Sequence, residues 1–175
     1  MKTMTTTEIE TRVAKAQELF KQGFNCSQSV FAACADLYGI TDESLALRLS
    51  ASFGGGIGRM RLTCGAACGM FLLAGLENGS ATPGDAEGKK HNYELVQSLA
   101  ADFKALHGSL TCSDLLGLTA VGGLSGKAGL TAQRSDSVSD PTPSERTTEY
   151  YHKRPCVEMV GNAVRIFLKH GKTLE

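Results

Sequence analysis

Apolar residues recur at helical spacing along most of the chain, and short polar or glycine-containing segments separate these stretches. No stretch alternates apolar and polar residues as a half-buried strand does. We therefore predict an all-α fold, a compact domain of six to seven helices. The predicted helices cover residues 8–22, 26–38, 42–53, 63–76, 84–107, 112–116 and 155–170.

Polar residues at helix starts support these boundaries. Thr7 and Glu10 have the spacing of a capping box, and so do Asn25 and Gln28. Thr41 is the expected N-cap of the third helix. Glycines follow the predicted ends of the first, second, fifth and last helices, as expected of C-terminal stops.

The spacing of apolar residues also predicts which faces are buried. In the third helix, Leu45, Leu49 and Phe53 are expected to point inward. Cys34 lies between Phe31 and Tyr38 on one helical face, so we expect it to pack as a small buried hydrophobe.

Residues 119–149 interrupt the helical pattern. Glycine, serine, threonine, aspartate and two prolines dominate there, and little periodicity remains. This composition predicts a long loop or partly disordered insertion within a single domain of residues 1–175.

Composition and charge exclude several functions. A chain of 175 residues can bury a core without disulfides or a metal. The formal net charge is zero, so we expect no nucleic-acid partner. Residues 1–10 lack the apolar core of a secretory signal, and the apolar run 70–76 is far shorter than a membrane span. We therefore expect a cytoplasmic protein without membrane insertion.

Cysteine usage narrows the function further. In a reducing compartment, six cysteines indicate metal binding or thiol catalysis more than a disulfide framework. Four of them lie at predicted helix starts, where free backbone N–H groups and the helix dipole favour a thiolate. These four are Cys26, Cys64, Cys112 and Cys156. We expect the N-termini of these helices to converge on a cysteine cluster.

The same residues resemble a known family. Residues 64–69 read C-G-A-x-x-G, and together with Cys26, Cys112 and Cys156 they resemble the C_GCAxxG_C_C family of redox-active proteins. Residues 23–26 and 53–58 are similar to that family's other blocks. The resemblance implies four family cysteines and a redox role whose substrate is not established. Cys34, Cys68 and the length of residues 119–149 are additional to the pattern.

A thiol-redox protein is the first functional hypothesis. Because Arg59 and Arg61 precede it, Cys64 is expected to be the most activated nucleophile. Cys26, Cys112 and Cys156 would be its resolving partners, and the pair would span two helices because no C-x-x-C is present. An oxidoreductase is compatible with this hypothesis, but the sequence names neither a redox partner nor an oligomeric state.

A metal or iron–sulfur module is the second hypothesis. Cys68 lies one helical turn after Cys64, and Cβ atoms at that spacing are about 5–6 Å apart, too far for a disulfide. The same spacing suits two ligands of one zinc ion or cluster. The candidate ligands are Cys26, Cys64, Cys68, Cys112 and Cys156. His152 is the one histidine considered as a further ligand or proton carrier.

Two further alternatives assign no chemical role to the cysteines or to the glycine loop. In the first, the cysteines only pack in a helical scaffold. The glycines of residues 54–58 lack the lysine and the preceding strand of a phosphate-binding loop, and a flexible turn is the simplest interpretation.

Overall fold

The computed structural model describes residues 4–118 and 140–170, and it confirms the all-α prediction. The α-helices are α1 (Thr6–Lys21), α2 (Cys26–Ala32), α3 (Glu43–Ser50), α4 (Gly65–Asn78), α5 (Ala86–His107), α6 (Cys112–Leu115), α7 (Thr148–Lys153) and α8 (Cys156–His170). Two short 3-10 helices are η1 (Ala35–Tyr38) and η2 (Ala51–Phe53). Within the described residues, a single bridge between Thr63 and Thr111 is the only β-type pairing.

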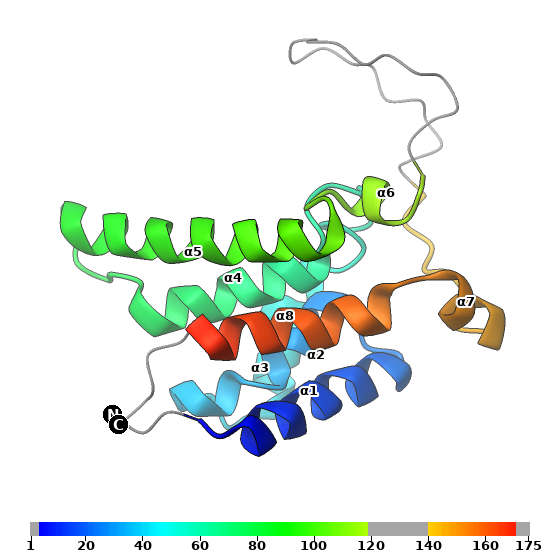
Figure 1. The fold of residues 1–175 in the computed structure, drawn as a ribbon, viewed down its shortest axis with the longest axis horizontal. Helices are drawn as coiled ribbons and strands as arrows, with labels where there is room; N and C mark the ends of the chain where they lie inside the picture. The colour runs from blue at the N-terminus through cyan, green and yellow to red at the C-terminus, as the bar shows by residue number, and fades with distance from the viewer. Residues whose placement is uncertain (1–3, 119–139, 171–175) are drawn as a thin grey trace, which may run out of the picture.

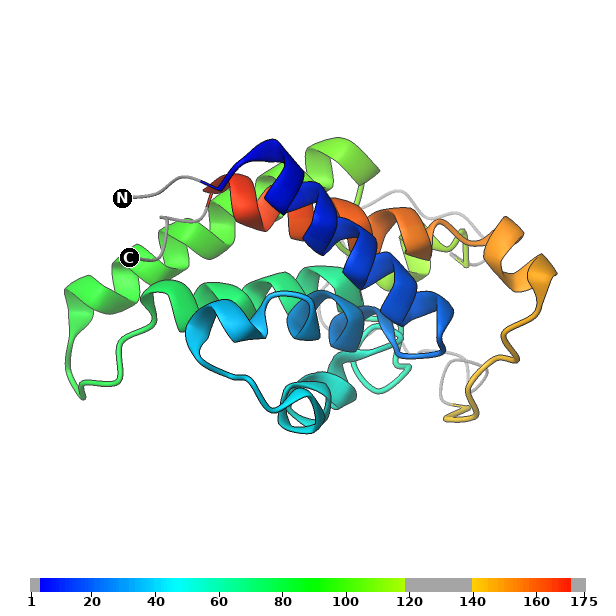
Figure 2. The same cartoon turned by 90° about the horizontal axis from the view of Figure 1, so that it is seen from below.

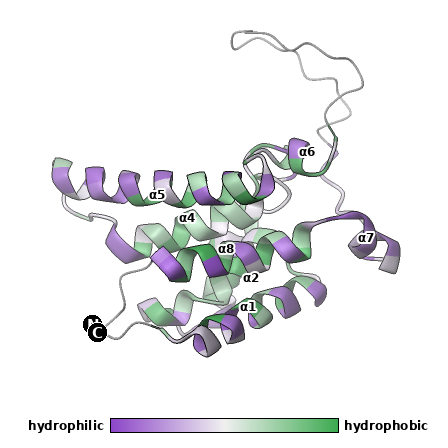
Figure 3. Cartoon of the chain, viewed as in Figure 1, coloured by the Kyte–Doolittle hydropathy of each residue, from purple (hydrophilic) through white to green (hydrophobic). Residues whose placement is uncertain are grey.

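Helix α4 lies at the centre of the bundle and packs against α2, α5 and α8 (Figure 1). Its sequence is apolar along most of its length, whereas α5 and α7 carry more hydrophilic residues (Figure 3). Met70, Leu73 and Ala74 of α4 are fully buried with Leu99 and Phe103 of α5. In the part of the chain that the structure describes, no helix is both long and apolar enough to cross a membrane.

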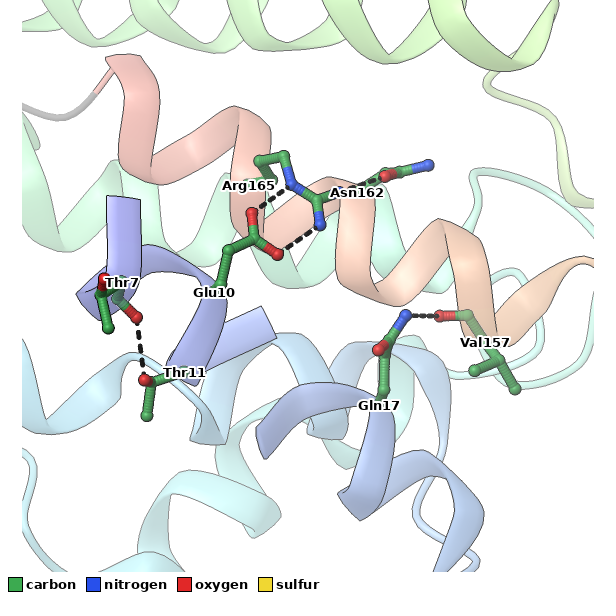
Figure 4. A network of polar contacts seen from close by, with 7 residues as sticks. All are labelled: Thr7, Glu10, Thr11, Gln17, Val157, Asn162 and Arg165. Atoms are coloured by element: carbon green, nitrogen blue, oxygen red, sulfur yellow. Dashed lines mark hydrogen bonds and ion pairs between the residues drawn. The ribbon is translucent and has the colours of Figure 1, made fainter. Parts of the chain in front are cut away.

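Helices α1 and α8 pack side by side through a polar seam (Figure 4). Arg165 donates two hydrogen bonds to the carboxylate of Glu10, at 2.8 and 2.7 Å, and a third to Asn162. Nearer the start of α8, the side chain of Gln17 donates to the carbonyl of Val157 at 3.4 Å. The Gln17 contact holds the first turn of α8 against α1, and the Arg165–Glu10 pair holds a later turn.

The two predicted capping boxes have different outcomes. Asn25 caps α2 and Gln28 returns the bond, both at 3.0 Å, as expected. The box on α1 is formed by Thr5 and Glu8 and not by Thr7 and Glu10, because the helix begins earlier than the apolar pattern indicates.

The long second helix that we predicted is interrupted. Helix α2 ends at Ala32, and η1 continues to Tyr38 before Gly39 adopts a left-handed conformation. Arg12 from α1 accounts for the break, because it donates to the carbonyl of Ala33 and makes a two-bond ion pair with Asp36.

The predicted inward face of the third helix is wrong. Asp42, not Thr41, is the N-cap, and the buried residues of α3 are Ala46 and Ser50. Leu45 and Leu49 are 39% and 51% exposed. The small residues face α2 because the two helices approach closely, and the larger leucines are left outside.

The C-terminal third contains a helix that the sequence pattern did not predict. Helix α7 spans residues 148–153 with Thr147 as N-cap, and its first two residues fall within the predicted loop of residues 119–149. Residues 140–147 form no helix or strand, as that prediction expects, and residues 119–139 lie outside the described residues. Helix α8 agrees with its prediction, and Val160, Val164 and Phe167 are fully buried.

Candidate functional site

Four helix starts meet at one end of the bundle, where α2, α4, α6 and α8 begin (Figures 1 and 2). Cys26, Cys112 and Cys156 are the first residues of α2, α6 and α8, and Cys64 is the N-cap of α4. The other three thiols all act electrostatically on Cys26, and Cys156 acts on both Cys64 and Cys112. We call them the cysteine cluster, and all four are free thiols.

A short backbone ladder holds Cys64 and Cys112 next to each other. The amide of Cys64 donates to the carbonyl of Leu110 at 2.7 Å, and the amide of Cys112 donates to the carbonyl of Leu62 at 2.6 Å. These two bonds flank the Thr63–Thr111 bridge. The starts of α4 and α6 are therefore joined by main-chain bonds that do not depend on the thiols.

The glycine loop before Cys64 is packed against the cysteine cluster and is not the loose turn that we expected. A Cβ atom on Gly56 would lie 2.6 Å from the Cβ of Cys112, and one on Gly65 would lie 3.1 Å from the Cβ of Cys26. At Gly54 it would lie 2.3 Å from the side chain of Asn25, the cap of α2. Glycine at these positions allows the cluster to close.

The same loop has an unusual backbone. Ile57, Arg59 and Arg61 have φ values of 61°, 65° and 60°, in the left-handed region that disfavours residues with a Cβ. Ile57 is β-branched, which makes its conformation the most costly of the three. Such strain persists only where surrounding contacts impose it. Here it directs Arg61 to the cluster, with Nη1 3.9 Å from Sγ of Cys112.

Cys26 and Cys156 form the most polar contact in the cluster. Their thiols are hydrogen-bonded to each other, and this bond lowers the pKa of Cys156 to about 7. The same bond, with burial, raises the pKa of Cys26 well above its usual value. The bond therefore joins a thiolate on Cys156 to the S–H group of Cys26.

Three guanidinium groups explain why Cys156 is the ionised partner. Arg154, Arg146 and Arg61 all lower its pKa through their positive charge. The groups that act on Cys26 are other thiols, and they raise its pKa. The two thiols of the pair therefore differ in pKa because the neighbouring guanidinium groups act on Cys156.

Cys64 does not have the acidity predicted from its neighbouring arginines. Burial raises its pKa to about 12, and the backbone amides of Ala67 and Ala66 offset this only in part. Burial also raises the pKa of Cys112, although Arg61 opposes the shift. Helix starts do favour thiolates. At Cys64, which is only 5% exposed, desolvation destabilises the thiolate by more than the backbone hydrogen bonds stabilise it.

The two additional cysteines lie in different places. Cys68 is on the edge of the cluster, where its thiol contacts the carbonyl of Thr63 at 3.8 Å and burial raises its pKa to about 11. Cys34 is in the core away from the cluster, as predicted, and burial raises its pKa to about 12.

The segment before α8 supplies residues that sequence reasoning missed. Arg146 lies over the rings of Phe20 and Tyr150, at 4.3 and 4.8 Å, and donates to the carbonyls of Phe20 and Phe24. Burial raises the pKa of Tyr150, and the charges of Cys156 and Cys26 raise it further, whereas that of Arg146 opposes the shift. The sequence signal that could have identified these residues is their spacing: Arg146, Tyr150 and Arg154 follow one another at intervals of four residues.

His152, considered as a further ligand or proton carrier, lies on α7. It is exposed on α7 and lines an open cleft of about 490 Å³ together with Gln17 and Glu158. The groups that set the pKa of Cys156 are the arginines and Cys26, and His152 is not among them.

Within residues 4–118 and 140–170, the candidate metal ligands are not gathered into one group: no three or more cysteine, histidine or acidic side chains lie close enough together to hold an ion. The cluster instead contains one hydrogen-bonded pair, Cys26 and Cys156, and a second pair joined through the backbone.

Comparison with known families agrees with the resemblance seen in the sequence. The chain matches the family described as "Putative redox-active protein (C_GCAxxG_C_C)" over residues 24–170. Comparisons with curated proteins and with solved structures gave no match. The matched region contains all four residues of the cysteine cluster, and the chain therefore belongs to the C_GCAxxG_C_C family.

Proposed function

We propose that this protein is a thiol-based redox protein in which Cys26 and Cys156 form the primary dithiol/disulfide pair. The observation that carries the proposal is the hydrogen bond between the two thiols, with the thiolate on Cys156. A thiolate whose pKa is close to ambient pH is the best attacking group in thiol–disulfide exchange. A partner thiol in direct contact is suited to resolve the mixed disulfide.

The reaction uses the residues in two steps. The thiolate of Cys156 attacks one sulfur of a substrate disulfide, the substrate S–S bond breaks, and one substrate thiolate leaves. Cys26 then loses its proton and attacks the Cys156 sulfur, which releases the second substrate thiolate. The substrate disulfide gains two electrons and becomes two thiols, while the protein dithiol becomes one disulfide.

Cys64 and Cys112 are proposed as a second dithiol. Their charges act on Cys26, and the charge of Cys156 acts on both of them. Exchange within the cluster would convert a Cys26–Cys156 disulfide and the Cys64/Cys112 dithiol into a Cys26/Cys156 dithiol and a Cys64–Cys112 disulfide, without an external reagent. Their raised pKa values make this second pair the slower one to react.

Redox titration with mass mapping tests the proposal. The reduced protein is equilibrated in glutathione buffers of increasing oxidation, quenched with acid, and mapped by peptide mass. We expect a two-electron transition that first links Cys26 to Cys156. Cys156→Ser should abolish this transition, whereas Cys34→Ala, which lies outside the cluster, should retain it. Six free thiols across the whole series would contradict the proposal.

A further inference from the structure

Three arginines beside the cysteine cluster point to the substrate class. We propose that the Cys26–Cys156 pair reacts preferentially with disulfides that carry negative charge, such as those bearing carboxylates, because Arg61, Arg146 and Arg154 offer uncompensated positive charge at the site. The inference rests on the proposed thiol-redox function. We call these three residues the arginine group.

The members of the arginine group come from three positions in the chain, and all three carry charges that act on Cys156. Arg61 comes from the strained glycine loop and contacts Cys112 at 3.9 Å. Arg154 precedes α8 and its guanidinium lies 4.6 Å from the ring centre of Tyr150. Arg146 lies 4.8 Å from the same ring, on α7's N-terminal side. Tyr150 thus has a guanidinium from Arg146 and another from Arg154 against its ring.

Among the described residues, the charges of the arginine group have no acidic partners. Elsewhere in the chain Arg12, Arg59 and Arg165 form ion pairs with carboxylates. For the arginine group, the described residues provide carbonyl, ring and thiol contacts, and no ion pair to a carboxylate.

Acidic residues of α6, α7 and α8 interact with other groups. Glu149 pairs with Lys153, and Asp114 accepts a hydrogen bond from Ser109. Glu158, in the first turn of α8, acts on His107. The positive charge of the arginine group is therefore left for the thiolate and for whatever approaches it.

One thiolate cannot balance three guanidinium groups. A single negative charge on Cys156 leaves two positive charges in excess, and all three side chains are partly exposed. Guanidinium groups bind carboxylates through paired hydrogen bonds. A positive site also raises the local concentration of anions and their rate of encounter. The leaving substrate thiolate would be stabilised by the same charges.

The experiment compares three small disulfides of similar size and different charge: dithiodipropionate (dianion), hydroxyethyl disulfide (neutral) and cystamine (dication). Single-turnover rates of Cys26–Cys156 oxidation are measured by acid quench and mass mapping. Each rate is divided by the rate of the same disulfide with 2-mercaptoethanol. We expect the normalised rate of the dianion to exceed that of the dication by about tenfold or more at low salt, and salt to reduce the ratio.

Two variants make the comparison specific. Arg154→Gln should reduce the ratio of dianion to dication, because a change in the reactivity of Cys156 alone would scale all three rates together. Arg165→Gln removes a guanidinium that is paired with Glu10 at the α1–α8 seam, and it should leave the ratio unchanged. If Arg154→Gln fails to fold, the salt dependence of the unmodified protein decides the same question.

The outcomes separate the two proposals. If none of the three disulfides oxidises the pair, the proposed redox function is wrong. If all three oxidise it at equal normalised rates, or the dication reacts fastest, the redox function stands and the preference for anionic substrates is overturned.

Discussion

The thiols of Cys26 and Cys156, the first residues of α2 and α8, interact so that the pKa of Cys156 falls to about 7 and that of Cys26 rises. The two residues lie far apart in sequence and are joined by the packing of α2 and α8. Neither helix start produces this polarised pair by itself, since Cys64 and Cys112 occupy similar starts and have raised pKa values.

Removing the hydrogen bond should make Cys156 less acidic. In Cys26→Ala the thiolate loses its donor, so the pKa of Cys156 should rise above about 7. The measurement is the rate of iodoacetamide labelling of Cys156 against pH, read by peptide mass. Labelling at neutral pH should slow by up to about tenfold for each pH unit of displacement.

Cys26→Ser is the matched control for that experiment, because the serine O–H can still donate to the thiolate. Its profile should lie between those of the unmodified protein and Cys26→Ala. Identical profiles for all three proteins would show that the hydrogen bond does not set the acidity of Cys156.

The glycine loop should tolerate a methyl group at Gly58 better than at Gly56. Both have positive φ, 56° and 74°, so alanine at either should cost about 1–2 kcal/mol of backbone strain. Only Gly56 has Cys112 within 2.6 Å of the added Cβ, whereas the nearest atom to that Cβ at Gly58 is 4.0 Å away. Overpacking should add about 1–3 kcal/mol for Gly56→Ala.

Urea unfolding of both variants under reducing conditions measures the difference. The labelling rate of Cys156 should change in Gly56→Ala and remain unchanged in Gly58→Ala. Equal losses of stability would mean that the loop can move away from Cys112 at no cost.

The reduced protein should lose stability as the pH rises above about 9. Burial raises the pKa of Cys34 and of Cys64 to about 12, so both thiols stay protonated in the fold after they ionise in the unfolded chain. The unfolded state then binds fewer protons than the folded state, and the free energy of unfolding falls with pH. Each such thiol contributes up to about 1.4 kcal/mol per pH unit.

Cys34→Ala isolates one of these contributions. It should be less stable than the unmodified protein at pH 7, because it removes a buried side chain. The difference should shrink as the pH rises through the alkaline range, since the variant no longer keeps a proton that the unfolded chain releases. Urea unfolding across that range provides the test, and a constant difference would contradict it.

The two capping boxes should differ in their effect on the site. Asn25→Ala removes the cap of α2 and the hydrogen bond from Asn25 to the carbonyl of Ala51, and it should cost about 1–2 kcal/mol. Thr5→Ala removes the cap of α1 and should cost about 1 kcal/mol. Unfolding measurements give both costs. Only Asn25→Ala should also alter the labelling of Cys156, because Asn25 adjoins Cys26.

Local sequence was sufficient for the helical class and for several helix ends. Asn25 and Gln28 cap α2 as their spacing predicts, and Cys34 is buried as its face predicts. These features depend on residues within one or two turns of each other. The prediction for Leu45 and Leu49 is wrong because periodicity does not tell which of two possible faces meets the neighbouring helix.

The sequence by itself determined that four cysteines stand at or next to helix starts and that they match one family. It could not determine which thiol ionises. Tertiary structure decided that, because desolvation and charge depend on segments distant in the chain: Cys64 is enclosed by the packed glycine loop, whereas Cys156 meets Cys26, Arg61 and Arg146. Arg146 lies in a segment predicted to be a loop, and only the fold brings it to the cysteine cluster.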